Sequence, residues 1–197
     1  MKEYNIVLCG VGGQGTILAS KIIAQTAIRL NINCRVGETH GMSQRGGSVV
    51  SHVRIGDKVL GAITPENQGH LMLAFEPVES LRYMNFLKKD GWVVLNTHPI
   101  VPTSVNAGLA KYPDIKTILE ELQKATSKVV SIPASDIATS IGSIISLNMV
   151  ILGAASIVPD FPFSGEEMKK SIKELVKPAF YESNVKAFES GARAFNR

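Results

Sequence analysis

The chain has 197 residues, 45% of them hydrophobic, which is enough to bury the core of a single α/β domain. Lysine and arginine outnumber aspartate and glutamate by 21 to 17, and no basic run exceeds two residues, so nucleic acid is not indicated as a partner. The two cysteines, Cys9 and Cys34, are too few for a four-cysteine iron-sulfur cluster and lack the spacing of a metal site.

Apolar runs and helical periodicity divide the chain into alternating strands and helices. The predicted elements, in chain order, are a strand at 5–9, a helix at 16–30, strands at 34–36, 48–55 and 59–63, a strand at 71–75, a helix at 76–87, a strand at 92–95, a helix at 113–124, a strand at 128–132 and helices from 134 onward. Gly56 and Asp57 predict a hairpin turn between the strands at 48–55 and 59–63.

This order predicts an α/β fold, with residues 1–197 forming one domain. We expect a Rossmann-like, mostly parallel sheet with helices on both faces, an antiparallel hairpin and a helical C-terminal part. The opening residues MKEYNIVLCG enter a strand without an export-signal pattern, so a cytoplasmic protein is expected. Residues 137–158 carry no charge, but their serines, threonine, asparagine and glycines favour a buried helix pair over a membrane span.

A glycine-rich turn, Gly10-Val11-Gly12-Gly13-Gln14-Gly15, joins the first strand to the first helix. Glycines there allow backbone N–H groups to approach a phosphate, and the helix dipole favours an anion. A turn that needs positive φ angles would require the same residues without any ligand. A dinucleotide site also needs an acidic residue farther on, and Glu38 lies 23 positions after Gly15.

Glu38 opens a polar, glycine-rich loop, His40-Gly41-Met42-Ser43-Gln44-Arg45-Gly46-Gly47, which an ordinary dinucleotide fold does not carry there. Arg45 is suited to binding a carboxylate or phosphate, or to a structural salt bridge with a partner chain. His40 could carry a proton or make a structural hydrogen bond.

Two residues outside these loops are further candidates. Glu76 follows a buried strand, where it could face a ligand or a partner, although capping of the next helix would explain it equally. Asn148, within an apolar helix, needs hydrogen-bond partners, which nearby backbone or a partner subunit could supply.

Four motifs resemble one protein family over nearly the whole chain: GVGGQG, THGMSQRGGSV, AFEPVESLRY and LNMVILGA. Together they are similar to the gamma domain of pyruvate, 2-oxoglutarate and indolepyruvate ferredoxin oxidoreductases. The loop at 40–47 most resembles the beta subunit of the indolepyruvate enzymes. That family cleaves a 2-oxoacid with thiamine diphosphate, passes electrons through iron-sulfur clusters to ferredoxin and transfers the acyl group to coenzyme A.

The resemblance implies a cluster-free subunit that completes such a complex. Thiamine diphosphate, magnesium and the iron-sulfur clusters would lie on a large partner subunit, because this sequence lacks their motifs, and coenzyme A would be shared. The candidate cofactor-contacting residues are Gly10, Gly12, Gly13, Gln14, Gly15, His40, Ser43, Gln44, Arg45, Gly46, Gly47 and Glu76. The alternatives are a free-standing Rossmann protein that binds NAD or another nucleotide, as an oxidoreductase or sensor, and a purely structural assembly factor.

Overall fold

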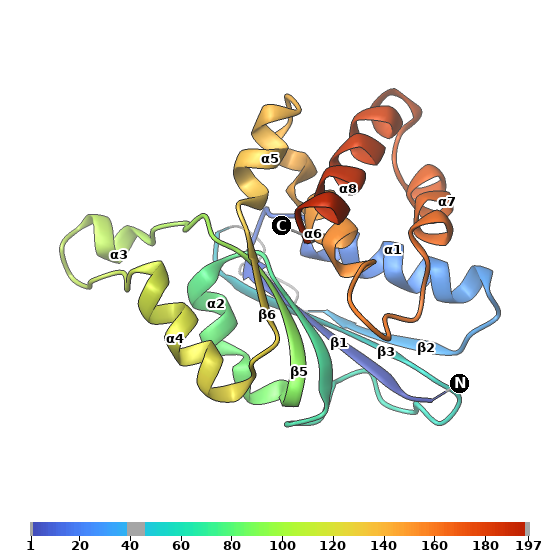
Figure 1. The fold of residues 1–197 in the computed structure, drawn as a ribbon, viewed down its shortest axis with the longest axis horizontal. Coiled ribbons are helices and arrows are strands. Elements are labelled where there is room, and N and C mark those ends of the chain that lie inside the picture. Colours follow the sequence, from blue (N-terminus) through green and yellow to red (C-terminus); the bar gives the residue numbers. More distant parts are fainter. Residues whose placement is uncertain (1, 39–45, 196–197) are drawn as a thin grey trace.

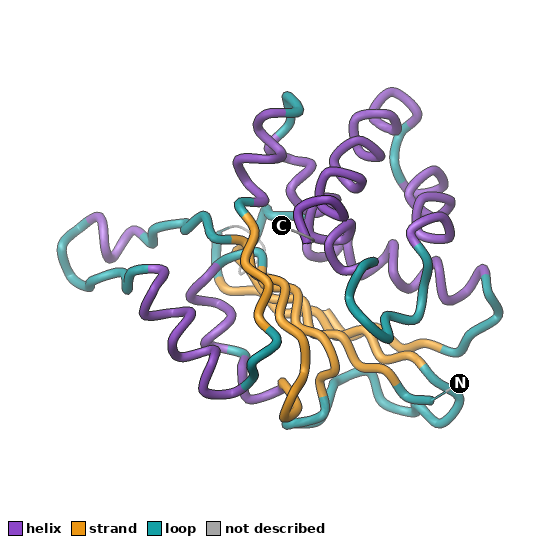
Figure 2. Tube along the Cα trace, in the orientation of Figure 1, coloured by secondary structure: helices purple, strands orange, loops and turns teal. Residues whose placement is uncertain are grey.

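The computed structural model describes residues 2–38 and 46–195, and over these residues a six-stranded sheet lies between two layers of helices (Figures 1 and 2). The strands are β1 (Tyr4–Val11), β2 (Cys34–Glu38), β3 (Ser48–Ile55), β4 (Gly69–Ala74), β5 (Leu87–Asn96) and β6 (Val129–Ile132). The helices are α1 (Thr16–Arg29), α2 (Pro77–Arg82), α3 (Thr103–Asn106), α4 (Ile115–Ala125), α5 (Ala134–Ser140), α6 (Leu147–Ala155), α7 (Gly165–Leu175) and α8 (Tyr181–Phe195). Short 3-10 turns occupy Met84–Phe86, Ile144–Ser146 and Pro178–Phe180.

The strand order is β2-β3-β1-β4-β5-β6. Strands β1, β4, β5 and β6 run parallel, whereas β3 is antiparallel to both of its neighbours, β1 and β2. The carboxyl ends of the four parallel strands therefore meet at one edge of the sheet, which is where open α/β sheets bind their ligands. This architecture confirms the predicted α/β fold class with its mostly parallel sheet and an antiparallel part, although the antiparallel partners of β3 are β1 and β2.

Alternate residues of each strand face opposite helix layers. Ile6 and Leu8 of β1 belong to the core beneath α1 and the C-terminal helices, whereas Cys9 joins Met72 in the core beneath α2 and α4. Figure 1 shows the same division, with α1 and α5–α8 on one face of the sheet and α2–α4 on the other. Two separate cores thus fix the sheet from both sides.

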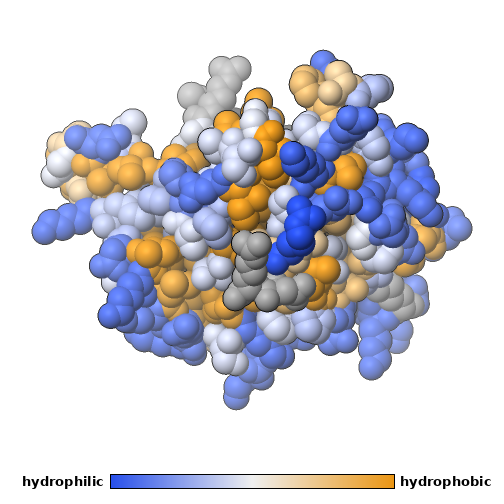
Figure 3. Space-filling view, turned by 45° about the horizontal axis from the view of Figure 1, so that its top comes forward, coloured by the Kyte–Doolittle hydropathy of each residue, from blue (hydrophilic) through white to orange (hydrophobic). Residues whose placement is uncertain are grey.

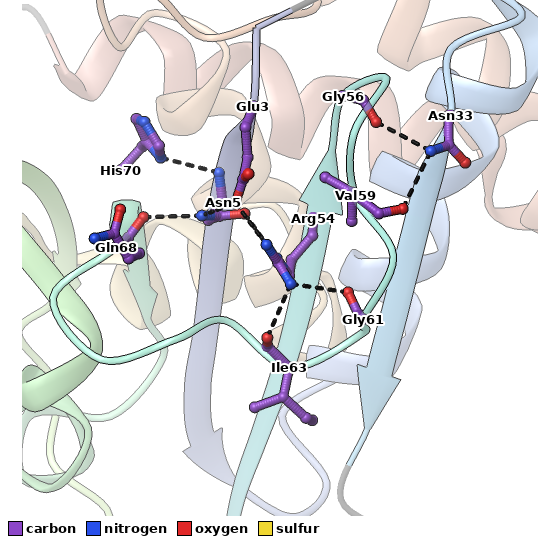
Figure 4. Close-up of polar contacts among 10 residues, drawn as sticks. All are labelled: Glu3, Asn5, Asn33, Arg54, Gly56, Val59, Gly61, Ile63, Gln68 and His70. Carbon is purple, nitrogen blue, oxygen red and sulfur yellow. Dashed lines mark hydrogen bonds and ion pairs between the residues drawn. The ribbon is translucent and has the colours of Figure 1, made fainter.

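The strand predicted at residues 59–63 is wrong, as is the hairpin turn before it. Both edges of β3 are already occupied, by β1 and β2, so no third strand can pair there. The segment is held by a side chain: Arg54 Nη1 donates to the carbonyl oxygens of Gly61 and Ile63 at 3.1 and 3.3 Å (Figure 4). Side-chain hydrogen bonds from Arg54 therefore hold this segment, in place of the backbone hydrogen bonds of a paired strand.

The predicted helix at 76–87 is shorter in the structure, because Leu87 begins β5 and pairs with Gly69 of β4. The strand predicted at 92–95 is correspondingly longer. Helix α3 was not predicted, since four residues are too few to display helical periodicity.

Residues 137–158 contribute to α5, a 3-10 turn and α6, and the predicted burial holds for α6 only, because Thr139, Ser140 and Ile145 are exposed. Every residue of α6 is buried. Within the part of the chain that the structure describes, no helix is both long and apolar enough to span a bilayer.

Candidate ligand site at the carboxyl edge of the sheet

The glycine turn leads from β1 to α1 with two residues at positive φ, Gly13 at 104° and Gly15 at 81°. A Cβ atom at Gly13 would meet nothing within 4 Å, whereas one at Gly15 would lie 2.6 Å from Nδ2 of Asn148. A hollow of about 260 Å³, lined in part by Gly12, Gly13 and Thr16, lies at this helix N-terminus. The backbone thus requires glycine at both positions, and the Gly13 side faces open space that a ligand could occupy.

Gln14 points into the protein. Its Oε1 accepts a hydrogen bond from the backbone N–H of Val11 at 2.7 Å, and its Nε2 donates to the carbonyl of Phe75 at 2.8 Å. A Cβ atom at Gly10 would approach Gln14 Oε1 to 2.6 Å and Phe75 Cβ to 2.8 Å. Gly10 therefore leaves room for an amide that ties the end of β1 to the end of β4.

The second candidate loop joins the first through its final residues. The Gly12 N–H donates to the Gly47 carbonyl at 2.8 Å, and the Gly46 N–H donates to the Gly12 carbonyl at 3.2 Å. Two segments that are 34 positions apart, from Gly12 to Gly46, are thereby paired at one edge of the sheet. The other candidates in this loop, His40, Ser43, Gln44 and Arg45, lie outside the described residues.

Glu76 caps the N-terminus of α2, which was one of the two roles predicted for it. The residue is 1% exposed, and its Oε2 accepts the backbone N–H of Glu79 at 3.1 Å. Its Oε1 also accepts hydrogen bonds from the Ile100 N–H, at 3.2 Å, and from the Tyr112 hydroxyl. Burial and the adjacent Glu76 carboxylate raise the pKa of Tyr112, which therefore remains a protonated donor.

Ile100 and Tyr112 belong to residues 98–113, a segment that connects β5 to α4 and that we call the arm. With α3 near its tip, the arm projects away from the sheet in Figure 1, and Figure 3 shows hydrophobic surface along it. Ile100 and Val101 are each 40% exposed and Leu109 is 82% exposed. The arm therefore presents apolar side chains to its surroundings.

A cleft of about 560 Å³ separates the arm from the body of the fold. That volume is within the usual range for small-molecule sites, roughly 300–1,000 Å³. The cleft is lined by Val11, Gly46 and Ser48 from the body, by Glu76, Glu79 and Arg82 around α2, and by Ile100, Thr103, Lys111 and Tyr112 from the arm, among others. Because Val11 and Gly46 adjoin Gly12, the cleft is continuous with the edge that carries the glycine turn.

Sequence reasoning missed the cations of this cleft, Arg82 and Lys111. The side chain of Arg82 is 56% exposed and its Nε bonds to Glu79 Oε2 at 3.1 Å. Neither residue belongs to a recognisable spacing pattern, so only the course of the arm brings them together. A weaker signal was available for Arg82, which stands within the AFEPVESLRY motif.

Asn148 bonds nearby backbone, as predicted. Its Oδ1 accepts the Met149 N–H at 2.9 Å and its Nδ2 donates to the Gly15 carbonyl at 3.4 Å. The amide therefore anchors the start of α1 to α6 beneath the glycine turn.

Glu38, the candidate for contacting a dinucleotide ribose, lies on the outermost strand. The antiparallel strand β3 separates β2 from β1, so Glu38 is displaced from the glycine turn by about 10 Å, two strand spacings. Its Oε1 accepts a hydrogen bond from Ser20 of α1 at 2.7 Å. The arrangement differs from a dinucleotide site, in which the acidic strand lies next to the first strand.

The two cysteines do not form a cluster site. Cys9 is fully buried in β1 and Cys34 lies in β2, with β3 between them. Burial raises the pKa of both thiols, which disfavours the thiolates that a metal needs. Across residues 2–38 and 46–195, no three His, Cys, Asp or Glu side chains gather as metal ligands would.

The strand order and the glycine turn at the carboxyl edge define a Rossmann-like α/β protein with an adjoining cleft. A family model described as pyruvate ferredoxin/flavodoxin oxidoreductase matches residues 5–194, so the chain belongs to this family. Indolepyruvate oxidoreductase subunit IorB of Pyrococcus horikoshii is 46% identical over an alignment 197 positions long, which covers 98% of this chain and 96% of the relative. The predicted resemblance to the indolepyruvate branch is thereby confirmed.

Solved structures agree with this placement. The gamma subunit of a keto/oxoacid ferredoxin oxidoreductase from Geobacter sulfurreducens is 25% identical, with a TM-score of 0.72 and 98% of each chain covered. A 2-oxoglutarate:ferredoxin oxidoreductase from Magnetococcus marinus, with 2-oxoglutarate, coenzyme A and succinyl-CoA bound, contains the same fold. That match covers 100% of this chain and 31% of the larger one, at 21% identity and a TM-score of 0.73.

Proposed function

We propose that this chain is the small, cluster-free subunit of a cytoplasmic complex that oxidatively decarboxylates an aryl 2-oxoacid, such as indolepyruvate, to an acyl-coenzyme A. Ferredoxin would receive the electrons. The observation that carries the proposal is the 46% identity to an indolepyruvate oxidoreductase subunit over nearly the full length of both chains. Residues 1–197 would act as one unit, without activity in the absence of the large subunit.

The large subunit would hold thiamine diphosphate, magnesium and the iron-sulfur clusters. The described residues of this chain do not suit those groups, because its two thiols lie on separate strands and no acidic or histidine cluster is present. Thiamine diphosphate supplies the carbanion chemistry of decarboxylation when it is bound to the partner. The role of this chain would be to complete the assembly and to contribute to the binding of coenzyme A.

Coenzyme A is an elongated polyanion, and the carboxyl edge offers features that suit one. The N-terminus of the 14-residue helix α1 adjoins the open side of Gly13, and α1 carries no acidic residue in its first turn. Arg82 and Lys111 line the neighbouring cleft. The proposed contacts are the backbone of Gly12, Gly13, Gly15, Gly46 and Gly47, with Arg45, Ser43, Gln44 and His40 from the second loop. Gly10, Gln14 and Glu76 would support the site from behind.

A reconstitution experiment tests this proposal. The large subunit is assayed anaerobically for coenzyme A-dependent oxidation of an aryl 2-oxoacid, with and without the purified chain. Activity should require both components, and the rate should saturate with coenzyme A. Full activity of the large subunit alone would contradict the proposal.

The rival is a free-standing NAD- or nucleotide-binding oxidoreductase or sensor. The glycine turn favours it, whereas the position of Glu38 on the outer strand and its bond to Ser20 do not. Calorimetric titration of the isolated chain with NAD separates the two ideas. Micromolar NAD affinity together with turnover of a hydroxy acid would establish the rival.

A further inference from the structure

The first turn of α2 carries two buried carboxylates that hold opposite sides of the cleft. Glu76 is 1% exposed and Glu79 is 6% exposed. Glu79 is paired with Arg82 of the same helix at 3.1 Å, and each carboxylate also accepts hydrogen bonds from segments distant in sequence. Buried carboxylates are costly unless such donors satisfy them, so both contacts have a structural purpose.

Glu76 closes the base of the arm. A single oxygen, Oε1, accepts hydrogen bonds from the Ile100 N–H at one end of the arm and from the Tyr112 hydroxyl at the other. Its second oxygen is fixed by the Glu79 N–H, so the carboxylate has a defined orientation. Hydrogen bonds to an ionised acceptor are roughly twice as strong as neutral ones. The negative charge of Glu76 is therefore part of what keeps the two ends of the arm together.

Glu79 holds the facing wall. Its carboxylate accepts a hydrogen bond from the Ser48 hydroxyl, which also bonds to the Tyr83 hydroxyl at 2.9 Å. Ser48 begins β3 immediately after Gly46 and Gly47, the residues that pair with the glycine turn. One short helix thus connects the wall that adjoins the glycine turn to the wall formed by the arm.

We propose that Glu76 is a positioning residue: it touches no ligand, and it fixes the arm as the outer wall of the cleft, which Lys111 of the arm and Arg82 of α2 both line. This inference rests on the proposed role of the chain in coenzyme A binding. It assigns Glu79 the equivalent task on the opposite wall. The two carboxylates then control separate segments, and the substitutions Glu76→Gln and Glu79→Gln become controls for each other.

Hydrogen–deuterium exchange of the full chain tests the structural half. Glu76→Gln keeps the size of the side chain and removes its charge, and should raise exchange in residues 98–112 about fivefold, as expected for replacing charged by neutral hydrogen bonds. Tyr112→Phe should act on the same residues, whereas Glu79→Gln should act on residues 46–50. Asp114→Asn, at the exposed cap of α4, controls for general loosening. Unchanged exchange in the arm, or a uniform rise across the chain, would overturn the proposal.

Kinetics of the assembled complex test the functional half. Glu76→Gln should raise the KM for coenzyme A about fivefold and leave kcat within about twofold, because the lost interaction acts on binding. Loosening of the arm with an unchanged KM would also overturn the proposal. If the wild-type rate showed no dependence on coenzyme A, the proposed function itself would fail, a result that the exchange experiment cannot produce.

Discussion

Gly13 and Gly15 lie two positions apart in one turn, yet an added methyl group would meet different surroundings at each. Both have positive φ, so alanine at either position should cost about 1–2 kcal/mol of folding free energy. At Gly15 the methyl would also press against the Asn148 amide. We predict that Gly15→Ala melts at a clearly lower temperature than Gly13→Ala.

The same pair separates ligand binding from folding. The Gly13 side of the turn is open, so a methyl there should obstruct a phosphate and raise the KM for coenzyme A in the complex. Thermal melts recorded beside the kinetics distinguish the two effects. If Gly13→Ala lost activity only in proportion to stability, the glycines would serve the turn alone.

His52 gives the fold a dependence on pH. The residue is 3% exposed in β3, and burial, together with the charge of Arg54, lowers its pKa from 6.5 to about 4. His52 therefore becomes protonated below pH 6.5 in the unfolded chain, but only below about pH 4 in the folded chain. Its contribution to stability is complete above pH 6.5 and falls as the pH decreases through that window, by about 1.4 kcal/mol per pH unit.

Urea unfolding at several pH values checks this expectation. His52→Gln should lose less stability than the wild type between pH 6.5 and pH 4, although it should be less stable at pH 8. Parallel stability curves for the two proteins would show that His52 does not titrate as described.

The residue types in the sequence predicted the local roles of side chains, but not their partners in distant parts of the chain. The glycine turn and the capping by Glu76 follow from short-range rules on φ angles and helix N-termini. The inward direction of Gln14 does not, because its partner, the Phe75 carbonyl, is 61 positions away. The hydrogen bonds that Glu76 accepts from Ile100 and Tyr112 are likewise between residues distant in sequence, so a local pattern does not predict them.

Helices α6 and α8 approach each other through glycines. A Cβ atom at Gly153 would overlap the carbonyl oxygen of Phe188, and one at Gly191 would overlap that of Val150. Alanine at either position must push the backbones apart, and overpacking of this kind costs about 1–3 kcal/mol or more. We predict that both variants melt well below the wild type in differential scanning calorimetry.

Gly165 supplies the matched control for this pair. It begins α7, and its added Cβ would lie 3.4 Å from Cε1 of Phe188, an ordinary contact. Gly165→Ala should therefore leave the melting temperature almost unchanged. A similar loss in all three variants would mean that the helix interface is not the cause.

At the scale of elements, periodicity located the helices and strands, but pairing determined their limits. Residues 59–63 have the composition of a strand, yet both edges of β3 are already paired, with β1 and β2. Arg54 instead donates hydrogen bonds to the carbonyl groups of this segment. Leu87 fits a helical pattern, yet pairing with β4 draws it into β5. Both competitors are long-range contacts that a local pattern does not contain.

For the whole molecule, the alternation of strands and helices predicted the fold class, and four ordered motifs predicted the family. The antiparallel position of β3 could not be predicted, since it depends on which edge of β1 a distant strand occupies. That position separates Glu38 from the glycine turn, which argues against the hypothesis of an NAD-binding protein. The cleft could not be predicted from the sequence either, because Gly46, α2 and the arm, which line it, are far apart along the chain.

Anaerobic affinity purification of the tagged chain from its own organism tests whether the chain is a subunit of a 2-oxoacid:ferredoxin oxidoreductase. The eluate is assayed for aryl 2-oxoacid-dependent, coenzyme A-dependent reduction of ferredoxin, and the subunits are then separated and their iron is measured. We expect a larger iron-sulfur subunit to co-purify with this activity, and the chain itself to be colourless and free of iron. A chain that elutes alone, binds NAD and oxidises a hydroxy acid would contradict this expectation.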